Sequence, residues 1–500
     1  MKHLNGLLGA ISVLEIRGEI KEREEISAIE YDSRKVKKGA LFVAIRGLKT
    51  DGHQFIEHAV KSGARAIVCE EFPVTLDSET VYIRVENSRS ALALLAKRFY
   101  DAASEKLVMI GVTGTNGKTT TTMLIHSILT NAGVKTGLIG TIAYKIGNET
   151  IEAERTTPEA VELHAFFDKM IKAECKACVM EVSSHALELR RVHGIRYDVA
   201  VFTNLTRDHL DFHGTMENYF RAKKILFDSL DEKAVAVTNQ DDLYGERIVA
   251  DTKATVIRYG IEESDEKRLD EKRADVRAKV HSFQLFGTSM TICTNGEEHL
   301  QTIRHIGKFN LYNVLAAYSA GKAMKFSHEE IMRGISRCEG VAGRMEQVWS
   351  KDHRCAIVDY AHTPDALLNV IRAIKEVKSP EAKLITLFGC GGDRDKGKRP
   401  LMGEIAERES DIVILTSDNP RTENPETILD EIEAGMTKTK QYYRIADRQA
   451  AIRKGISLIG HGDVLLVAGK GHETYQEIQG VKYPFDDRAV IKKIFDETTA

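Results

Sequence analysis

The sequence predicts an α/β protein of three domains in which most strands are parallel. Short apolar runs alternate with helical pattern along the 500 residues, and several of these runs end in a charged or glycine-bearing loop. This alternation is typical of strand–helix–strand units. A chain of this length corresponds to about three domains at roughly 150 residues each. We therefore expect domains over residues 1–105, 106–339 and 340–500.

The first predicted domain has strand candidates but no phosphate-binding loop. The apolar runs Leu41–Ala44 and Ala66–Val68 are separated by helical pattern. The start of the chain, Met1–Leu14, is mildly apolar, but it carries a lysine and no clear cleavage site. We therefore interpret it as the first element of a domain rather than as a targeting signal.

The second predicted domain opens with a segment suited to nucleotide phosphates. A strand candidate, Leu107–Ile110, precedes the glycine-rich segment, and a helix candidate, Thr121–Leu129, follows it. Glycines let backbone N–H groups converge on phosphate oxygens, and the helix N-terminus favours negative charge. The residues expected to hold ATP or GTP are Gly114, Thr115, Asn116, Gly117, Lys118, Thr119 and Thr120.

A carboxylate ends a later strand candidate of the same domain. The run Ala177–Val182 contains Glu181, and the next run, Val199–Thr203, leads into a polar segment that contains His209. A buried carboxylate needs a partner for its charge. A divalent metal held beside the phosphate loop would supply one, and an ordinary salt bridge is the alternative.

The third predicted domain is a doubly wound parallel sheet of the Rossmann-like type. Its strand candidates are Cys355–Asp359, Leu384–Gly389, Ile412–Thr416 and Val464–Ala468. Functional residues of such sheets lie at the carboxyl ends of the strands. The charged loop Gly391–Arg399 and the segment Asp418–Arg421 occupy such positions, although each read alone is an ordinary surface loop or turn.

Composition argues against several classes of partner. Lysine and arginine number 71 against 74 acidic residues, and the net charge of −3 gives no electrostatic reason to expect nucleic acid or an anionic membrane. No apolar run approaches the roughly 20 residues that span a bilayer. Seven scattered cysteines indicate reduced thiols, and packing is the preferred reading of the close pair Cys175 and Cys178. We expect a cytoplasmic monomer that acts on small molecules.

The glycine-rich segment Gly114–Thr120, with the sequence GTNGKTT, resembles the Mur ligase family. This family comprises the ATP-dependent amide ligases of peptidoglycan assembly and their folylpolyglutamate synthetase relatives. The segment departs from the general phosphate-loop pattern because Val112 stands five residues before Gly117. The resemblance extends over nearly the whole chain. It implies a UDP-sugar domain, a central ATPase domain and a mobile C-terminal domain that brings an amino acid.

The resemblance also implies a catalytic apparatus with two Mg²⁺ ions. Thr119, Glu181 and His209 match metal positions of the family, and Lys223 matches a lysine that CO₂ converts to a carbamate ligand. Composition alone would make Lys223 and Lys224 solvated lysines of an amphipathic helix. The implied catalytic residues are Lys118, Lys223, His209 and Glu181. Further implied ATP contacts are Asn310, Asn313, Arg344, Asp359 and His362.

Two substrates follow from the same resemblance. The form Asp418–Arg421, DNPR, is associated with meso-diaminopimelate rather than L-lysine, and a guanidinium at Arg421 or Arg394 can clamp the second carboxylate. The implied amino-acid site is Arg394, Asp418, Asn419, Pro420, Arg421, Gly469 and Glu473. The implied contacts to UDP-MurNAc-L-Ala-D-Glu are Ser33, His53, Gln54, Thr156, Thr157, Ser183 and Arg191. Leu189 departs from the glutamine of some relatives.

The expected activity is a ligation in peptidoglycan precursor synthesis. Meso-diaminopimelate would be joined to the D-glutamate γ-carboxylate through an acyl phosphate, with ATP split to ADP and phosphate. An L-lysine-adding ligase is disfavoured by Arg421, and a folate polyglutamylating ligase by the N-terminal segment that contains Asp51–Phe55. A nucleotide-dependent switch that ligates nothing is the alternative from another class.

Overall fold

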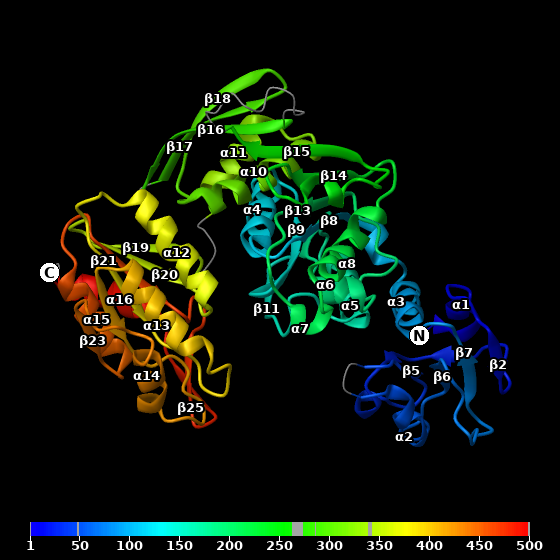
Figure 1. Ribbon diagram of the computed structural model, residues 1–500. Coiled ribbons are helices and arrows are strands. Elements are labelled where there is room, and N and C mark those ends of the chain that lie inside the picture. Colours follow the sequence, from blue (N-terminus) through cyan, green and yellow to red (C-terminus); the bar gives the residue numbers. More distant parts are fainter. Residues whose placement is uncertain (1, 48–49, 263–273, 286, 339–342, 499–500) are drawn as a thin grey trace. The chain divides into compact units, whose positions relative to one another are not determined.

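The computed structural model describes residues 2–47, 50–262, 274–285, 287–338 and 343–498, and Figure 1 shows their elements. The chain forms two compact units. The first comprises Met1–Gly260, Asp270–Val276 and Val314–Arg337, and the second comprises Ile261–Leu269, Arg277–Asn313 and Cys338–Ala500. The expected boundary between residues 339 and 340 lies outside the described residues.

The first unit begins with a sheet of five strands in the order β2-β7-β6-β5-β4, parallel except for β2. Its strands are β2 (Glu15–Arg17), β4 (Ile29–Glu30), β5 (Leu41–Val43), β6 (Ala66–Cys69) and β7 (Val81–Arg84), accompanied by the pair β1 (Lys2–His3) and β3 (Glu25–Ile26). Its helices are α1 (Leu4–Leu8), η1 (Ser33–Lys35), η2 (Gly52–Phe55), α2 (Ile56–Lys61) and α3 (Ser88–Phe99). Leu41 and Val43 pack into one buried cluster and Phe42 into another, as the alternation of side chains along a strand requires.

The second sheet of this unit carries the glycine-rich segment. The strands that this unit contributes follow the order β11-β10-β9-β12-β8-β13-β14-β15, and the sheet continues with β16, β17 and β18. Of these strands, β9, β12, β8, β13, β14 and β15 run parallel. The strands are β8 (Val108–Thr113), β9 (Thr136–Ile139), β10 (Ala143–Ile146), β11 (Glu149–Glu152), β12 (Ala177–Glu181), β13 (Val199–Phe202), β14 (Val235–Asn239) and β15 (Thr255–Ile261). The accompanying helices are η3 (Ala103–Lys106), α4 (Lys118–Asn131), α5 (Ala160–Lys172), α6 (Ser184–Glu188), α7 (Leu210–His213), α8 (Met216–Asp228), α9 (Gly245–Ile248) and α11 (His328–Arg337).

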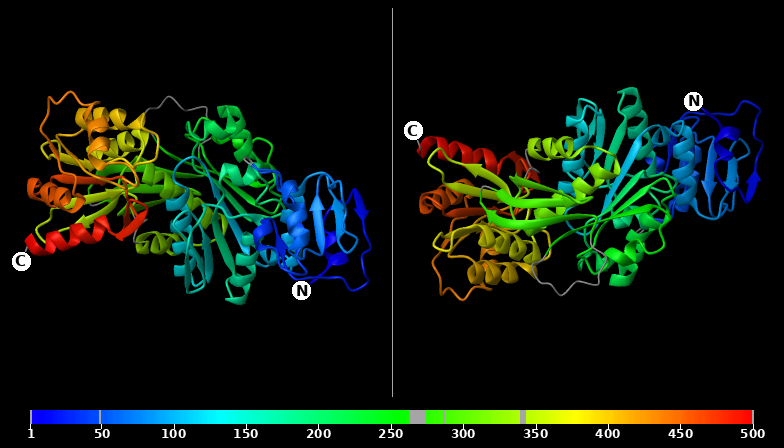
Figure 2. Two further views of the ribbon diagram at one scale, coloured as in Figure 1. Left: turned by 90° about the horizontal axis from the view of Figure 1, so that it is seen from below. Right: turned by 90° about the horizontal axis from the view of Figure 1, so that it is seen from above.

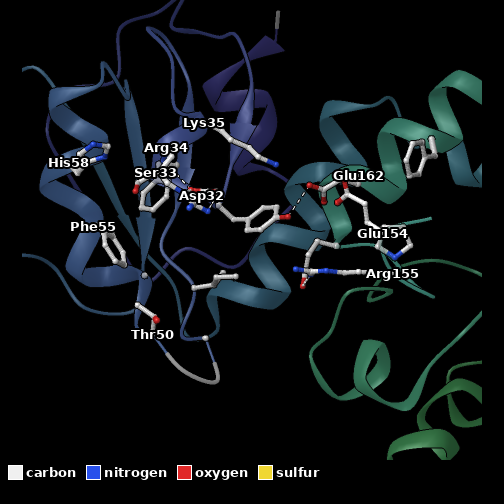
Figure 3. Close-up of a pocket in the computed structure, with 18 of the residues that line it drawn as sticks. Asp32, Ser33, Arg34, Lys35, Thr50, Phe55, His58, Glu154, Arg155 and Glu162 are labelled. Carbon is white, nitrogen blue, oxygen red and sulfur yellow. Dashed lines mark hydrogen bonds and ion pairs between the residues drawn. The ribbon is translucent and has the colours of Figure 1, made fainter. Parts of the chain in front are cut away.

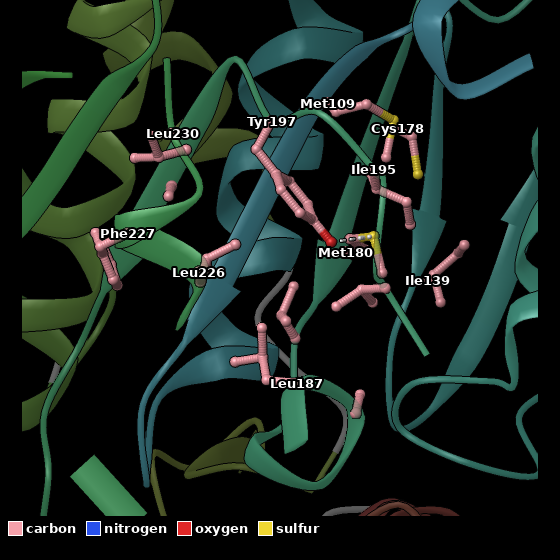
Figure 4. Packing of buried hydrophobic residues seen from close by; sticks show 14 of the residues in the cluster. Met109, Ile139, Cys178, Met180, Leu187, Ile195, Tyr197, Leu226, Phe227 and Leu230 are labelled. Carbon is pink, nitrogen blue, oxygen red and sulfur yellow. Dashed lines mark hydrogen bonds between the residues drawn. The ribbon is translucent and has the colours of Figure 1, made fainter. Parts of the chain in front are cut away.

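One face of this second sheet is covered by a large apolar cluster. Figure 4 shows members of this cluster, among them Met109, Cys178 and Met180 from the strands and Leu226 and Phe227 from α8. All of these side chains are buried. Strands with such continuous apolar runs are expected where helices cover both faces of a parallel sheet.

The second unit contains a doubly wound sheet in the order β19-β20-β24-β21-β22-β23, parallel except for β19. The strands are β19 (Glu346–Trp349), β20 (Cys355–Asp359), β21 (Leu384–Phe388), β22 (Ile412–Leu415), β23 (Tyr442–Arg444) and β24 (Val464–Ala468). The helices are α12 (Pro364–Val377), α13 (Lys398–Glu409), α14 (Pro425–Glu433), α15 (Arg448–Leu458) and α16 (Asp487–Thr498). Other elements are β16 (Val276–Gln284), β17 (Gly287–Thr294), β18 (Glu297–Ile303), the start of α10 (Lys308–Ala323) and the hairpin of β25 (Tyr475–Ile478) and β26 (Val481–Pro484).

Helices cover both faces of the sheet of the second unit, as Figure 2 shows. Val464 and Leu466 of β24 belong to the cluster that includes residues of α12, α13 and α14. Leu465 and Val467 belong to the cluster that includes residues of α15 and α16. The predicted α/β class, with mostly parallel sheets and a doubly wound C-terminal part, is therefore confirmed.

The cysteines and helices bear on two of the expectations from composition. All seven cysteines lie within the described ranges and are free thiols, and Cys175 and Cys178 are buried in the apolar cluster. Among the helices of the described residues, none combines the length and apolar character needed to cross a bilayer.

His164 on α5 is expected to make folding sensitive to acid. Its side chain is 0% exposed, neither ring nitrogen has a hydrogen-bond partner among the described residues, and it packs edge-on against Phe167. Burial lowers the pKa of His164 from 6.5 to about 3. The unfolded chain therefore binds one more proton than the folded chain between these values, and stability falls as pH falls below 6.5. The loss amounts to roughly 2 kcal/mol by about pH 5.

Denaturant unfolding of the wild type and of His164→Leu at about pH 7.5 and pH 5 measures this effect. We expect the loss of stability between the two pH values to be smaller in the variant by roughly 2 kcal/mol. His3→Leu, which removes an exposed imidazole of the same unit, is the control. An equal loss in the wild type and both variants would contradict the assignment to His164.

Candidate active site

The glycine-rich segment forms a tight turn between β8 and α4. Gly114 has φ 149° and Gly117 has φ 86°, and Gly117 caps the helix that begins at Lys118. A Cβ atom on Gly114 would lie 1.9 Å from Thr203 Oγ1, so this position has no space for a larger residue. The turn therefore has the backbone that a phosphate loop needs, at the N-terminus of a 14-residue helix.

The phosphate loop is fastened to the segment that follows β13. Asn204 Oδ1 accepts from the Asn116 N–H at 3.0 Å, and the Asn204 carbonyl accepts from the Thr115 N–H at 2.8 Å. The Thr203 hydroxyl donates to the Asn116 carbonyl at 2.6 Å. Sequence reasoning assigned no role to Asn204. The available signal was an amide side chain directly after a buried strand that neighbours the loop strand.

Two lysines donate to the same carbonyl of this loop. Lys118 Nζ lies 2.9 Å from the Gly114 carbonyl oxygen and 2.7 Å from that of Thr115, and Lys223 Nζ lies 2.9 Å from Gly114 O. Lys223 is only 1% exposed, and burial, assisted by the positive charge of Lys118, holds its pKa well below the usual value. The solvated lysine that composition suggests is wrong at this position. Lys224 instead forms ion pairs with Asp228 and Asp251.

Glu181 ends β12 as a buried carboxylate held by neutral groups. It is 1% exposed, and it accepts from the Thr141 N–H at 2.9 Å and from the Thr141 hydroxyl at 3.1 Å. Within the described ranges it forms no ion pair with a basic side chain. Because the negative charge of Glu181 has no such partner, this end of the sheet is suited to bind a cation.

His209 lies at the start of α7 with its ring beside that of His185, the centroids being 4.9 Å apart. Burial lowers the pKa of His209, although Asp208 opposes the shift. The neutral ring keeps a lone pair for a metal. No cluster of three or more histidine, cysteine or acidic side chains suited to a metal occurs in the described part of the chain. A metal here would need hydroxyl, phosphate or carbamate oxygens in addition.

Four of the predicted substrate residues gather around the end of β12. The Thr157 hydroxyl donates to the Glu181 carbonyl at 2.8 Å and accepts from the Ser183 N–H at 3.1 Å. Arg191 Nη1 donates to the Thr157 carbonyl at 3.1 Å. The Thr156 hydroxyl lies 3.0 Å from that of Thr141, which also binds Glu181. These residues thus form one polar cluster with the buried carboxylate.

Ser33 lines a cavity of about 960 Å³ in the first unit, shown in Figure 3. Lys35 and Phe55 also line it. Arg155, between β11 and α5, and Glu162, on α5, contribute to the same lining. The Tyr31 hydroxyl donates to Glu162 Oε1 at 2.8 Å across the cavity wall. Aromatic, cationic and hydroxyl groups in a space of this size suit a nucleotide-sugar. Tyr31, Lys35 and Arg155 were not predicted from the sequence.

His53 and Gln54 lie on η2 beside this cavity, but the structure gives His53 an internal role. Its Nδ1 lies 2.6 Å from Asp51 Oδ1, and its Nε2 accepts from the Glu70 N–H at 2.9 Å. Both ring nitrogens are thus engaged within the fold. Gln54 is exposed and lies outside the residues that line the cavity.

The predicted nucleotide residues of the second unit form two groups. Asn310 and Asn313 are buried on α10, with Asn313 Nδ2 donating to Asn310 Oδ1 at 3.2 Å. Asp359 ends β20 and accepts from the N–H groups of Met345 and Ala361, each at 2.8 Å. Burial raises the pKa of Asp359.

Arg344 and His362 both lie close to the ring of Tyr360. The Arg344 guanidinium carbon is 5.3 Å from the centroid of this ring, and the His362 ring centroid is 4.7 Å from it. Burial lowers the pKa of His362. The two groups can therefore offer one permanent cation and one neutral imidazole beside an aromatic face.

The two segments predicted to bind the amino acid, residues 418–421 and 469–473, share a buried polar network. Asn419 Nδ2 donates to Glu473 Oε2 at 2.8 Å. Lys470 is 0% exposed and donates to Asn419 Oδ1 and to Glu473 Oε2, each at 3.0 Å. A Cβ atom on Gly469 would lie 2.5 Å from Asp418 Oδ2, so only glycine fits beside this carboxylate. Lys470 was missed because a lysine between two glycines reads as solvated.

Arg421 joins the charged loop to the hairpin of β25 and β26. Its Nη1 donates to the Gly392 carbonyl at 2.8 Å, and its Nε donates to Glu477 Oε2 at 3.2 Å. Arg394 is exposed on the charged loop, whereas Pro420 is buried. Arg421 is 20% exposed on its side chain, so a partly solvated cation lies beside the network of Asn419 and Glu473.

Comparison with known proteins matches three stretches of the chain to family domains. Residues 25–100 match the catalytic domain of the Mur ligase family, residues 112–321 the Mur ligase middle domain, and residues 343–471 the Mur ligase glutamate ligase domain. A protein of Chlorobaculum tepidum named "UDP-N-acetylmuramoyl-L-alanyl-D-glutamate--2,6-diaminopimelate ligase" is 47% identical over 98% of this chain and 97% of its own. A protein of Cytophaga hutchinsonii with the same name is 43% identical over 99% of each chain.

A solved structure titled with the same ligase name superimposes with a TM-score of 0.72. It is 33% identical and covers 95% of this chain and 96% of its own. The similarity therefore extends over the whole length in both sequence and structure. Together with the phosphate loop and the C-terminal loops, these comparisons establish that the chain belongs to the Mur ligase family.

Proposed function

We propose that this chain joins meso-2,6-diaminopimelate to the γ-carboxylate of D-glutamate in UDP-MurNAc-L-Ala-D-Glu. The observation that carries the amino-acid assignment is the geometry of Arg421, a partly exposed guanidinium fixed on one side by Gly392 and Glu477. A guanidinium pairs with a carboxylate through two parallel hydrogen bonds. Diaminopimelate has a second carboxylate for this pairing, and L-lysine has none. The names of the full-length relatives support the same substrate pair.

ATP activates the carboxylate of the sugar peptide in the first step. The carboxylate attacks the γ-phosphorus, ADP leaves, and an acyl phosphate forms. Lys118 and the N-terminus of α4 neutralise phosphate charge, and the backbone of Gly114–Gly117 holds the phosphate oxygens. Arg344 and His362 of the second unit would contact the nucleotide, as would Asn310, Asn313 and Asp359.

The amine of diaminopimelate attacks the acyl phosphate in the second step. A tetrahedral intermediate forms, its collapse expels phosphate, and the amine loses a proton as the amide is completed. Asp418, Asn419 and Glu473 would orient the amino acid, and Arg421 would hold its distant carboxylate. Exclusion of water matters because water would hydrolyse the acyl phosphate.

The residues present fit two Mg²⁺ ions and a carbamate. Thr119, Glu181, His209 and the carbamate of Lys223 would hold the metals, which would offset charge on the phosphoryl group. The buried Glu181 has only neutral partners in the described part of the chain, so its negative charge is available to bind a cation. Only a neutral amine adds CO₂, and the lowered pKa of the buried Lys223 favours that form.

The cavity around Ser33 is the proposed site of the UDP-sugar. The cluster of Thr156, Thr157, Ser183 and Arg191 would receive the peptide, which places its glutamate close to Glu181. We further propose the domain boundaries 1–105, 106–339 and 340–500 and a cytoplasmic monomer, since the free cysteines suit a reducing compartment.

Amine-dependent phosphate release tests this function. The purified chain is given Mg²⁺, ATP and UDP-MurNAc-L-Ala-D-Glu with meso-diaminopimelate, L-lysine or no amine, and the product mass is measured. We expect a tripeptide product with diaminopimelate, and kcat/KM for L-lysine lower by at least about 10²-fold. Equal use of L-lysine would favour the lysine-adding ligase. Phosphate release indifferent to every amine would instead favour the nucleotide switch.

A further inference from the structure

Hydrogen bonds join the hairpin of β25 and β26 to the segment Asp418–Arg421. Gln476 Nε2 donates to the Asp418 carbonyl at 2.6 Å, and the Glu477 N–H donates to Asn419 Oδ1 at 2.9 Å. The Arg421 N–H donates to the Glu477 carbonyl at 3.0 Å, and the Gln479 N–H donates to the Arg421 carbonyl at 2.7 Å. The hairpin therefore determines where the backbone of this segment lies.

The hairpin and the charged loop together hold the Arg421 side chain. Glu477 Oε2 accepts from Nε at 3.2 Å, while Gly392 accepts from Nη1 at 2.8 Å. Within the described residues Nη2 makes no hydrogen bond, so the end of the guanidinium retains donors. The backbone of Arg421 adopts φ 51°, a left-handed conformation that is uncommon for a residue with a side chain. Such a conformation persists only where surrounding contacts impose it.

We propose that Glu477 is a positioning residue that makes this ligase selective for an amino acid with a second carboxylate. The proposal rests on the proposed function. Glu477 fixes Nε of Arg421 so that the remaining N–H donors face the substrate carboxylate. Glu477 itself does not touch the substrate in this arrangement, since its carboxylate is turned to Arg421.

Removing Glu477 would leave the long side chain of Arg421 with only one of its two hydrogen-bond anchors, the Gly392 carbonyl. The guanidinium would then sample several rotamers, and its ordering would have to occur when the substrate binds. The expected consequence is weaker binding of diaminopimelate and no change in the chemical step. L-lysine, which lacks the second carboxylate, would be unaffected.

Steady-state kinetics of Glu477→Ala with both amines tests this role. We expect the KM for meso-diaminopimelate to rise roughly 5- to 10-fold. We expect kcat with diaminopimelate and kcat/KM with L-lysine each to change by less than about twofold, because neither depends on Arg421 ordering. Glu477→Gln retains an acceptor oxygen for Nε, and we expect a KM within about threefold of the wild type.

Further variants separate positioning from folding. Glu376→Gln neutralises an exposed acid on α12 of the same unit and is expected to leave both amines unchanged. In the background of Arg421→Ala, Glu477→Ala is expected to add nothing to the KM, since the residue it positions is gone. Glu477→Asp, which keeps the charge but not the reach, replaces the alanine variant where that variant does not fold.

The outcomes distinguish the two proposals. An unchanged KM for diaminopimelate in Glu477→Ala, or an equal loss of kcat/KM with both amines, would overturn the role of Glu477. The proposed function would still stand if the wild type formed the diaminopimelate product. A wild type that forms no such product would overturn both, and this is seen before any variant is compared.

Discussion

Replacing Lys223 with alanine is expected to reduce ATP-dependent amide formation by about 10³-fold, the effect of removing a fixed charge-stabilising group from an active site. The alanine variant has no amine to add CO₂ and therefore no carbamate to hold a metal. Lys223 is buried and donates to the Gly114 carbonyl, so the variant also loses a contact to the phosphate loop. Amine-dependent phosphate release measures the loss.

The adjacent lysine provides a matched control for this prediction. Lys224→Ala removes an ammonium that pairs with Asp228 and Asp251 at the surface of α8, and its activity is expected to stay within about twofold of the wild type. Carbamate on Lys223 is checked by the ¹³C NMR signal of protein supplied with ¹³C-bicarbonate. Full activity in Lys223→Ala, or a carbamate signal that persists in it, would exclude the proposed role.

Acidic pH is expected to reduce the amount of carbamate on Lys223. Burial lowers the pKa of Lys223 well below its usual value, which favours the neutral amine that reacts with CO₂. Protonation of the amine at lower pH competes with carbamate formation, so the carbamate signal and the activity should fall together as pH decreases. Added bicarbonate should shift this fall to lower pH.

Replacing Arg421 with alanine is expected to lower kcat/KM for meso-diaminopimelate by roughly 10²- to 10³-fold, because the substrate carboxylate would be left without its cation. kcat/KM for L-lysine should change by less than about threefold, since L-lysine makes no contact of this kind. Arg421→Lys keeps the charge but not the planar pair of donors, and an intermediate loss is expected. The ratio of the two kcat/KM values is the quantity to measure.

Arg394 is the alternative clamp and serves as the comparison. It is exposed on the charged loop, whereas Arg421 is held by Gly392 and Glu477. We expect Arg394→Ala to have the smaller effect on diaminopimelate. A larger effect of Arg394→Ala would transfer the selective contact to the charged loop. Thermal unfolding of each variant excludes a loss of folded protein as the cause.

The strands were accessible from sequence because they are buried on both faces. Val464–Ala468 and Cys355–Asp359 coincide with the expected runs, since continuous apolar segments bounded by polar loops have few other readings. The phosphate loop was accessible because its glycines and lysine have a fixed spacing between a strand and a helix. Both signals are local in the chain.

The contacts that hold the sites were not accessible, because they join segments far apart in sequence. Asn204, whose side chain accepts a hydrogen bond from the Asn116 N–H, lies 88 residues from Asn116 in the sequence. Glu477 lies 56 residues from the Arg421 guanidinium, and neither position has an unusual local pattern. Lys470 and Lys223 read as solvated lysines, and only the surrounding fold makes them buried.

The backbone of Arg421 has a consequence for how such a chain can evolve. A left-handed conformation costs about 1 kcal/mol or more for a residue with a Cβ atom, and glycine adopts it without this cost. Substitution by glycine would relieve local strain and discard the carboxylate clamp. An arginine at this position therefore carries a backbone cost that glycine would avoid, so a substitution that relieved this strain would also remove the selective contact.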